Sequence, residues 1–206
     1  MRSVVTAQRE FRAMNTAVRI LSSGSLGLLL LTEAEATFHS LEARLSRFLP
    51  DSELCHLNQH SGSPVRVSRE LFQVLRLAAI LHRRTRGTFD PAILPALEAA
   101  GYDRSFQQVQ SSNAEIAPGK TRQRPFRAVR LQPADRLATL PTGMRLDLGG
   151  IGKGYAVDRV AEVMAPARDY LIDAGGDIFA SGNSPHGPGW TVSVAGPFSP
   201  ERDVAI

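Results

Sequence analysis

The chain has 206 residues, a formal net charge of +4 and 43% hydrophobic against 21% charged residues, which is typical of a soluble globular protein with a real hydrophobic core. Its single cysteine, Cys55, excludes an internal disulfide and any cysteine-based zinc site. The positive charge is small and no aromatic residues interleave with the basic ones, so the composition disfavours nucleic-acid binding. Clusters of arginine, such as Arg83, Arg84 and Arg86, are compatible with binding of anionic ligands.

The apolar runs bear on membrane association. The longest, Leu26 to Leu31, is far too short to cross a bilayer, and no basic leader followed by a long apolar stretch opens the chain. As written, the sequence predicts a cytoplasmic protein that is neither exported nor anchored.

The first part of the chain predicts strands followed by a helix. Residues 4–21 are rich in β-forming residues, which indicates a pair of strands, or one bent strand, around Met14-Asn15-Thr16. A capping box at residues 32–35 and apolar residues at helical spacing predict a helix from Thr32 to about Leu49. Residues 50–58 then predict a short loop and half-turn.

The middle of the chain predicts two further helices. Ser68 caps an apolar helical face that ends near Arg83-Arg84, and Gly87 is a helix stop. Asp90-Pro91 forms a turn into a third, short helix through Leu97, where the carboxylate could serve a ligand or simply cap the helix. Residues 106–124 are polar and predict a surface insertion.

The last part predicts mainly short strands: residues 129–131, 136–140 and 144–146, a hairpin of 170–173 with 178–180 around a glycine turn, and a final strand at 190–194 with no obvious terminal element after it. A helix over residues 156–164 interrupts them. Interleaved helices with hairpin-like strand pairs predict an α+β fold with a mostly antiparallel sheet flanked by helices.

Residues 147–154, Asp-Leu-Gly-Gly-Ile-Gly-Lys-Gly, form the most informative stretch. Four glycines in six residues after a β-like segment predict a tight turn into a helix start. Backbone N–H groups, the helix dipole and Lys153 would together suit a diphosphate. The alternative is a glycine turn that only packs the helix on the sheet. The spacing matches neither a P-loop nor the dinucleotide fingerprint.

Five segments in order resemble one family, the ApbE proteins, which are FAD:protein FMN transferases. The resemblance covers nearly the whole chain and lies at Phe11 to Thr16 (F-x-A-M-G-T in the family), Ser46 to Asn58 (S-x-F-x-P-x-S-E-L-x-x-L-N), Thr85 to Pro91 (T-x-G-x-F-D-P), Asp147 to Asp158 (D-L-G-G-I-A-K-G-Y-A-V-D) and Gly175 to Gly182 (G-G-D-I-x-x-x-G).

The resemblance implies one ApbE-like domain of T-fold-related architecture over residues 1–206, corresponding to the amino-terminal two thirds of the family domain. It also implies a Mg²⁺-dependent enzyme that cleaves the diphosphate of FAD and attaches FMN to a threonine hydroxyl of a target flavoprotein, with release of AMP. Carried over by position, the residues that touch FAD are Met14, Thr88, Phe89, Asp90, Asp147 and Lys153. A backbone oxygen at Gly150 would reach the metal, and the resemblance assigns no catalytic side chain in this chain.

This sequence departs from the family pattern at several points. Asn15 replaces the glycine of M-G-T, although asparagine tolerates left-handed backbone conformations, and Gly152 replaces the alanine of G-I-A-K-G. The family's final segments, which include a D-A-x-x-T motif that completes the metal site, and its lipoprotein cysteine have no counterpart. The sequence therefore also allows a non-catalytic FAD-binding module or an inactive fragment, and we expect the 206-residue chain alone to bind FAD weakly and to transfer no FMN.

Overall fold

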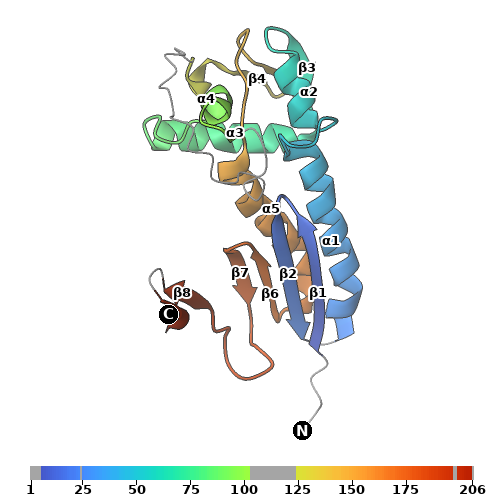
Figure 1. The fold of residues 1–206 in the computed structure, drawn as a ribbon. Helices are drawn as coiled ribbons and strands as arrows, with labels where there is room; N and C mark the ends of the chain where they lie inside the picture. Colours follow the sequence, from blue (N-terminus) through green and yellow to red (C-terminus); the bar gives the residue numbers. More distant parts are fainter. Residues whose placement is uncertain (1–5, 24, 103–123, 197–198, 206) are drawn as a thin grey trace. The chain divides into compact units, whose positions relative to one another are not determined.

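The computed structural model describes residues 6–23, 25–102, 124–196 and 199–205 (Figure 1). In chain order the elements are β1 (Thr6–Ala13), β2 (Thr16–Ser23), α1 (Ser25–Leu45), α2 (Glu53–Gln59), β3 (Pro64–Arg66), α3 (Arg69–Arg84), η1 (Pro91–Ile93), α4 (Leu94–Ala99), η3 (Phe126–Ala128), β4 (Arg130–Gln132), β5 (Leu137–Thr139), α5 (Gly149–Met164), η4 (Ala165–Ala167), β6 (Tyr170–Ala174), β7 (Asp177–Ser181), β8 (Ser193–Gly196) and β9 (Ser199–Ala205).

The described residues fall into two compact units. The first combines the described parts of 1–12, 16–37 and 157–206, and the second combines 13–15 with 38–156. The registered strand pairs, β2–β6, β6–β7, β3–β5, β4–β5 and β8–β9, are all antiparallel. Helices together with antiparallel sheets confirm the α+β prediction.

The first unit holds a sheet of order β1-β2-β6-β7. Along β2 every second residue is buried (Val18, Ile20 and Ser22), as expected for a strand with one covered face. Of the two alternatives predicted around Met14-Asn15-Thr16 the structure has the pair of strands, β1 and β2, and the predicted hairpin β6–β7 is present around Gly175-Gly176. Both glycines of the second turn have positive φ, 66° and 94°, and a Cβ on Gly175 would lie 2.1 Å from Thr16 Oγ1, so this turn requires glycine.

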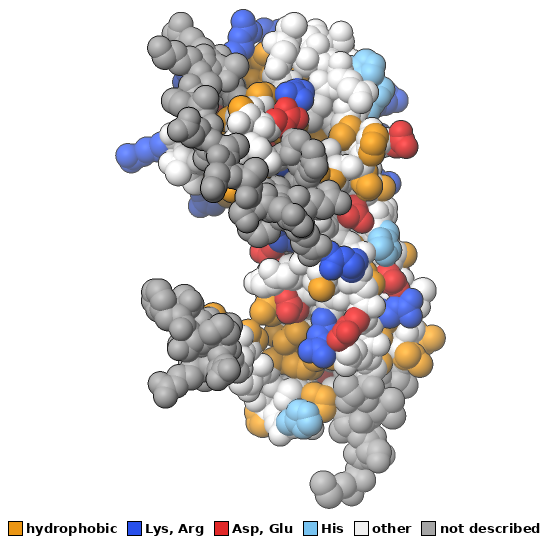
Figure 2. All heavy atoms as spheres, viewed as in Figure 1, with side chains coloured by type: hydrophobic (Ala, Val, Ile, Leu, Met, Phe, Trp, Pro, Cys, Tyr) orange, Lys and Arg blue, Asp and Glu red, His pale blue; other side chains and the backbone are white. Residues whose placement is uncertain are grey.

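Strand β7 has only β6 as a neighbour in this sheet. Its Ile178 and Phe179 are 40% and 37% exposed. Figure 2 shows hydrophobic side chains at the surface around this hairpin.

Helix α1 begins at Ser25, so the predicted start at Thr32 is wrong. The leucine run before Thr32 continues the helix because leucine is a strong helix former and Leu31 is buried on the same face as Ala34 and Phe38. The helix also ends earlier than predicted, at Leu45. Beyond the helix end, the carbonyl of Ser46 accepts a hydrogen bond from the Ser52 hydroxyl, with Oγ 2.5 Å from the carbonyl oxygen.

The second unit contains two helices capped by serine. Residues 53–59 form α2 rather than the predicted half-turn, with the Cys55 N–H donating to Ser52 Oγ at 3.0 Å. Ser68 caps α3 as predicted, because its Oγ accepts from the Leu71 N–H at 3.1 Å. The short strands of the same unit form a sheet of order β3-β5-β4.

Residues 144–146 do not form the predicted strand. The backbone of Leu146 instead pairs with a side chain: Asn58 Nδ2 donates to its carbonyl at 3.0 Å, and its N–H donates to Asn58 Oδ1 at 2.8 Å. Both residues are buried. An amide side chain thus takes the place of a strand partner directly before the glycine turn.

The end of the described chain also differs from the sequence prediction. The last predicted strand begins at Ser193 rather than Trp190, and β9 follows as a terminal element that pairs with β8. The predicted insertion at 106–124 lies outside the described residues apart from Arg124. No helix in the described ranges is both long enough and apolar enough to cross a membrane.

Candidate functional site

The glycine stretch forms the first turn of α5. Asp147 Oδ1 accepts the Gly149 N–H at 2.6 Å, and the Leu148 carbonyl accepts the N–H groups of Ile151 and Gly152 at 3.0 and 2.7 Å. The Gly150 N–H has no acceptor among the described residues. The first turn of a helix carries unpaired donors and partial positive charge, so this N–H can receive an anion.

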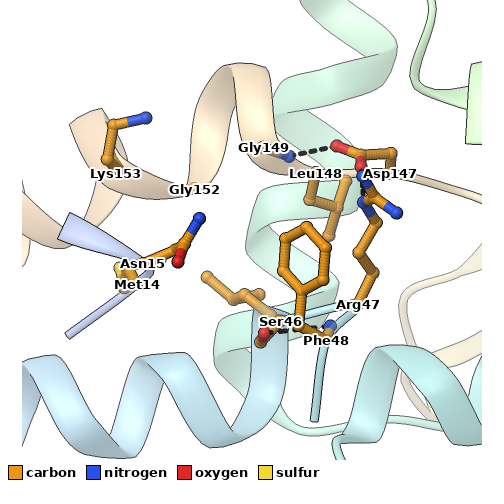
Figure 3. Close-up of a pocket in the computed structure, with 11 residues that line it drawn as sticks. Met14, Asn15, Ser46, Arg47, Phe48, Asp147, Leu148, Gly149, Gly152 and Lys153 are labelled. Carbon is orange, nitrogen blue, oxygen red and sulfur yellow. Dashed lines mark hydrogen bonds and ion pairs between the residues drawn. The ribbon is translucent and has the colours of Figure 1, made fainter. Parts of the chain in front are cut away.

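A pocket lies against this turn, entirely within the second unit (Figure 3). It encloses about 70 Å³, far less than the roughly 300–1,000 Å³ typical of pockets for whole small molecules. A dinucleotide could therefore place only part of itself there. The lining residues are Met14, Asn15, Leu45, Ser46, Arg47, Phe48, Asp147, Leu148, Gly149, Gly152 and Lys153.

One wall is the tip of the β1–β2 hairpin. Met14 and Asn15 both have positive φ, 52° and 62°, as the two central residues of a type I′ turn do. Asn15 therefore tolerates the position where the family has glycine. Glu42 Oε1 accepts the Met14 N–H at 2.7 Å, and Met14 Cε lies 3.2 Å from where a Cβ on Gly152 would be. Met14 thus packs directly on the glycine turn.

The opposite wall is built on an ion pair. Arg47 Nε lies 2.5 Å from Asp147 Oδ2, and the two side chains are only 11% and 12% exposed. Arg47 Nη2 also donates to the Tyr102 carbonyl at 2.7 Å, and its guanidinium lies 4.1 Å from the centre of the Phe48 ring. Both carboxylate oxygens of Asp147 are therefore engaged within the protein, one by Arg47 and one by Gly149.

The segment Thr88-Phe89-Asp90 approaches the glycine turn through Phe89. Its ring lies at ordinary contact distance, 3.4 Å, from where a Cβ on Gly150 would be. The Phe89 carbonyl is 2.9 Å from His82 Nδ1, and since a carbonyl only accepts, that nitrogen carries the proton. Thr88 has an exposed side chain and does not line the pocket.

Asp90 was predicted to face the same cavity as Asp147, but it lines a second one. Its Oδ1 accepts the N–H of Ala92 at 2.9 Å and that of Phe126 at 3.2 Å, so the carboxylate caps η1 and holds η3. The second cavity encloses about 630 Å³ and is lined by Ala79, His82, Arg83, Arg86, Gly87, Asp90, Pro125, Phe126, Arg127, Val129 and Leu131.

The structure therefore unites some of the predicted site residues and separates others. Met14, Asp147 and Lys153 line one pocket, and the Phe89 ring lies 3.4 Å from where a Cβ on Gly150 would be. The sequence interpretation missed Glu42 and Arg47. Arg47 occupies the x position of the S-x-F segment, and its only signal in the sequence is a charged residue two positions after the buried helix end at Leu45.

A metal site is harder to build from these side chains. Across residues 6–23, 25–102, 124–196 and 199–205, no three His, Cys, Asp or Glu side chains group as metal ligands would. Gly150, whose backbone oxygen was predicted to reach the metal, lies in the first turn of α5, where a helical carbonyl accepts from the N–H four residues on. Because Mg²⁺ prefers carboxylate and phosphate oxygens, the described residues by themselves do not fit a magnesium site.

Comparisons with known proteins agree on one family. A model described as the ApbE family matches residues 14–206. The FAD:protein FMN transferase of Haemophilus influenzae is 27% identical over 172 residues, which are 80% of this chain and 50% of that protein. The protein of the same name from Treponema pallidum is 34% identical over 163 residues, 74% of this chain and 44% of that protein. The chain spans about half the length of the curated relatives it matches.

Solved structures share the fold. The ApbE protein of Thermotoga maritima and the flavin transferase ApbE of Vibrio cholerae each superpose with a TM-score of 0.82 at 22% identity, covering 98% of this chain and 68% of theirs. The matched family model spans most of the chain and includes the hairpin tip and the glycine turn that form the pocket. The chain therefore belongs to the ApbE family.

Proposed function

We propose that this chain carries the FAD-binding part of an FAD:protein FMN transferase, with residues 1–206 as the amino-terminal portion of one transferase domain. The observation that carries the proposal is the pocket in which Met14, the Asp147 turn and Lys153 meet at the start of α5. An N–H without a protein acceptor and a lysine at a helix start favour a phosphate-bearing ligand.

The reaction that the family resemblance implies is a phosphoryl-type transfer. The threonine hydroxyl oxygen of an acceptor flavoprotein attacks the phosphorus of the FMN half of FAD. The bond from that phosphorus to the bridging oxygen breaks, AMP leaves with that oxygen, and the hydroxyl proton is released. Donors around the diphosphate stabilise the charge that develops, and in this chain the Gly150 N–H and Lys153 are suited to that task.

FAD needs more room than the small pocket offers, and we propose that the larger cavity in the same unit, lined by Asp90, takes the remainder. The Phe89 ring lies 3.4 Å from where a Cβ on Gly150 would be, and its carbonyl accepts a hydrogen bond from His82, which lines the larger cavity with Asp90. We therefore retain Met14, Thr88, Phe89, Asp90, Asp147 and Lys153 as the proposed FAD contacts. Asp147 contributes by ordering the turn, since both of its carboxylate oxygens are already engaged.

Magnesium, like the threonine acceptor, enters this proposal through the family resemblance. The described side chains do not fit a magnesium site by themselves. A metal held at the diphosphate would draw further oxygen ligands from outside the described residues.

Replacing Lys153 by Ala tests the diphosphate assignment. We expect FAD affinity to fall about 10- to 100-fold, the effect of losing one charge-assisted contact of roughly 1.5–3 kcal/mol. Riboflavin, which lacks the phosphates, should lose little. Flavin fluorescence titrations of both ligands give the two affinities, with Lys153→Arg as the charge-preserving control. Equal losses for the two ligands would contradict the assignment.

A second experiment separates a transferase from a non-catalytic FAD-binding module. The protein is incubated with FAD, Mg²⁺ and a threonine-bearing acceptor flavoprotein, and the acceptor is then weighed by mass spectrometry. A mass gain of one FMN at threonine supports transfer. FAD binding without any mass gain is the result expected of residues 1–206 alone, whereas a mass gain would show that these residues suffice for transfer.

A further inference from the structure

Both walls of the pocket are tied to the carboxyl-terminal end of α1. On the helix, Glu42 Oε1 holds the Met14 N–H of the hairpin tip at 2.7 Å. Two residues beyond the helix, Arg47 Nε holds Asp147 Oδ2 at 2.5 Å. Figure 3 shows the Arg47 side chain extending to Asp147, which in turn reaches the Gly149 N–H. A chain of contacts therefore runs from Arg47 through Asp147 to the glycine turn.

Arg47 is held in a single geometry. One guanidinium nitrogen donates to the Tyr102 carbonyl, another pairs with Asp147, and the group lies over the Phe48 ring. A planar guanidinium can satisfy these contacts together, whereas an ammonium group provides no such fork. Because the pair is almost completely shielded from water, removing Arg47 leaves the Asp147 charge without a compensating partner.

The position of Asp147 decides how the first turn of α5 presents its donors. With Oδ2 fixed by Arg47, Oδ1 can accept only from the neighbouring Gly149 N–H, and the next donor along, that of Gly150, stays available. If Asp147 turned away to find another partner or to reach solvent, the Gly149 N–H would lose its acceptor and the turn would lose its fixed orientation.

We propose that Arg47 is a positioning residue, which acts through Asp147 to hold the glycine turn in the conformation that receives phosphate. This inference rests on the proposed function, because it takes the FAD diphosphate as the group received. Arg47 itself makes no contact with ligand in this proposal.

A double-mutant cycle tests it. The variants are Arg47→Gln, Asp147→Asn and the combination, and the measured quantities are the dissociation constants of FAD and riboflavin from flavin fluorescence. We expect Arg47→Gln to weaken FAD at least tenfold more than riboflavin. In the Asp147→Asn background the same change should add less than twofold, since residues that act through one another are not additive.

The control is Arg145→Gln, which breaks the ion pair of Arg145 with Glu98 in the same unit; neither residue lines the pocket. This variant should lower the thermal midpoint and leave the ratio of the FAD and riboflavin constants unchanged. If circular dichroism shows that Arg47→Gln is unfolded, Arg47→Lys replaces it. The lysine keeps the charge and loses the fork, so the selective loss for FAD should be about three- to tenfold.

The possible results distinguish a failure of the Arg47 positioning role from a failure of the proposed FAD-binding function. Equal weakening of FAD and riboflavin by the Arg47 variants, or full additivity with Asp147→Asn, would overturn the positioning role. An unmutated protein that binds FAD no better than riboflavin would overturn the proposed function, and the positioning role with it. A preference for FAD that survives Arg47→Gln would overturn the positioning role alone.

Discussion

At the scale of single residues, Gly152 shows how closely the pocket is packed. It is buried in the first turn of α5, and its missing side chain makes room for the end of Met14. Met14 also adopts a left-handed backbone conformation, which a β-carbon disfavours. In this conformation its N–H donates a hydrogen bond to Glu42.

We expect Gly152→Ala to be neutral or to raise the free energy of unfolding by up to about 1 kcal/mol, because alanine is the better helix former. The added Cβ would lie 3.2 Å from Met14 Cε, and a methionine end can shift by a few tenths of an ångström. Urea unfolding measures the change. Gly175→Ala is the contrasting control: its positive φ and the Thr16 contact predict a clear loss. A comparable loss for Gly152→Ala would show that Met14 cannot move.

Tyr170 predicts an alkaline limit to stability. Burial raises the pKa of its phenol above the ordinary value near 10, and the hydroxyl donates to the Ala161 carbonyl at 2.9 Å. The folded state therefore keeps this proton longer than the unfolded state does. The resulting stabilisation is complete below pH 10 and is lost as the pH rises from about 10 through the folded pKa.

The measurement is the urea midpoint between pH 8 and 11. Tyr170→Phe should be less stable at pH 8, through loss of the hydrogen bond, but should lose less stability on going to pH 11 than the unmutated chain. Tyr155→Phe, which removes the hydroxyl that donates to Gln73, is the matched control. Parallel pH curves for the unmutated chain and Tyr170→Phe would contradict the assignment.

At the scale of elements, the segment before α5 depends on helix α2. The buried backbone of Leu146 has its two hydrogen bonds satisfied by the Asn58 side chain rather than by a neighbouring strand. This contact fixes the residue immediately before Asp147, and Asp147 itself donates its N–H to the Pro91 carbonyl at 2.8 Å. The residues directly before the glycine turn are therefore held by hydrogen bonds to Asn58 of α2 and to the Pro91 carbonyl, not by a neighbouring strand.

We expect Asn58→Ala to lower the free energy of unfolding by about 2–4 kcal/mol, because two buried backbone groups lose their partners together. The free energy of unfolding of Asn58→Asp should lie between those of the unmutated chain and Asn58→Ala, since a carboxylate can accept from the Leu146 N–H but cannot donate to the Leu146 carbonyl. Gln59→Ala, an exposed neighbour on the same helix, is the control and should change stability little. Urea denaturation followed by circular dichroism gives the values, and a change below about 0.5 kcal/mol for Asn58→Ala would contradict this account.

At the scale of the whole molecule, the proposed FAD site lies within one of the two units. Ligand binding to the folded chain must raise its apparent stability by mass action, by about 2.7 kcal/mol when the free ligand is at 100 times its dissociation constant. For a chain of this length, that corresponds to a rise of roughly 5–10 °C in the thermal midpoint.

We therefore expect FAD to raise the thermal midpoint of the unmutated chain, measured by circular dichroism, more than an equimolar mixture of riboflavin and AMP does. The mixture offers both ring systems and a single phosphate, that of AMP, but no diphosphate, so it controls for binding that does not need the diphosphate. A midpoint that does not respond to FAD, or that responds equally to the mixture, would contradict a site built around the diphosphate.

The sequence determined by itself those features that local physics controls. The hairpin around Gly175-Gly176, the Ser68 cap of α3 and the glycine turn at the start of α5 were predicted, because turn and cap residues act on their immediate neighbours. A pair of strands around Met14-Asn15 was one of two predicted alternatives. The spacing of Asp147 and Lys153 across the glycine turn also predicted that they share a pocket, and both line it.

Only the tertiary structure decided features that depend on partners distant in sequence. Burial of Leu31 extended α1 past its apparent cap, and the Asn58 amide replaced a strand at residues 144–146. Asp90 lines a second cavity, where its carboxylate accepts hydrogen bonds from the N–H groups of Ala92 and Phe126. Arg47 forms an ion pair with Asp147, one hundred residues later in the chain. Hydrogen bonds and ion pairs across such separations leave no periodic pattern in the sequence, so the walls of the site became visible only in the folded chain.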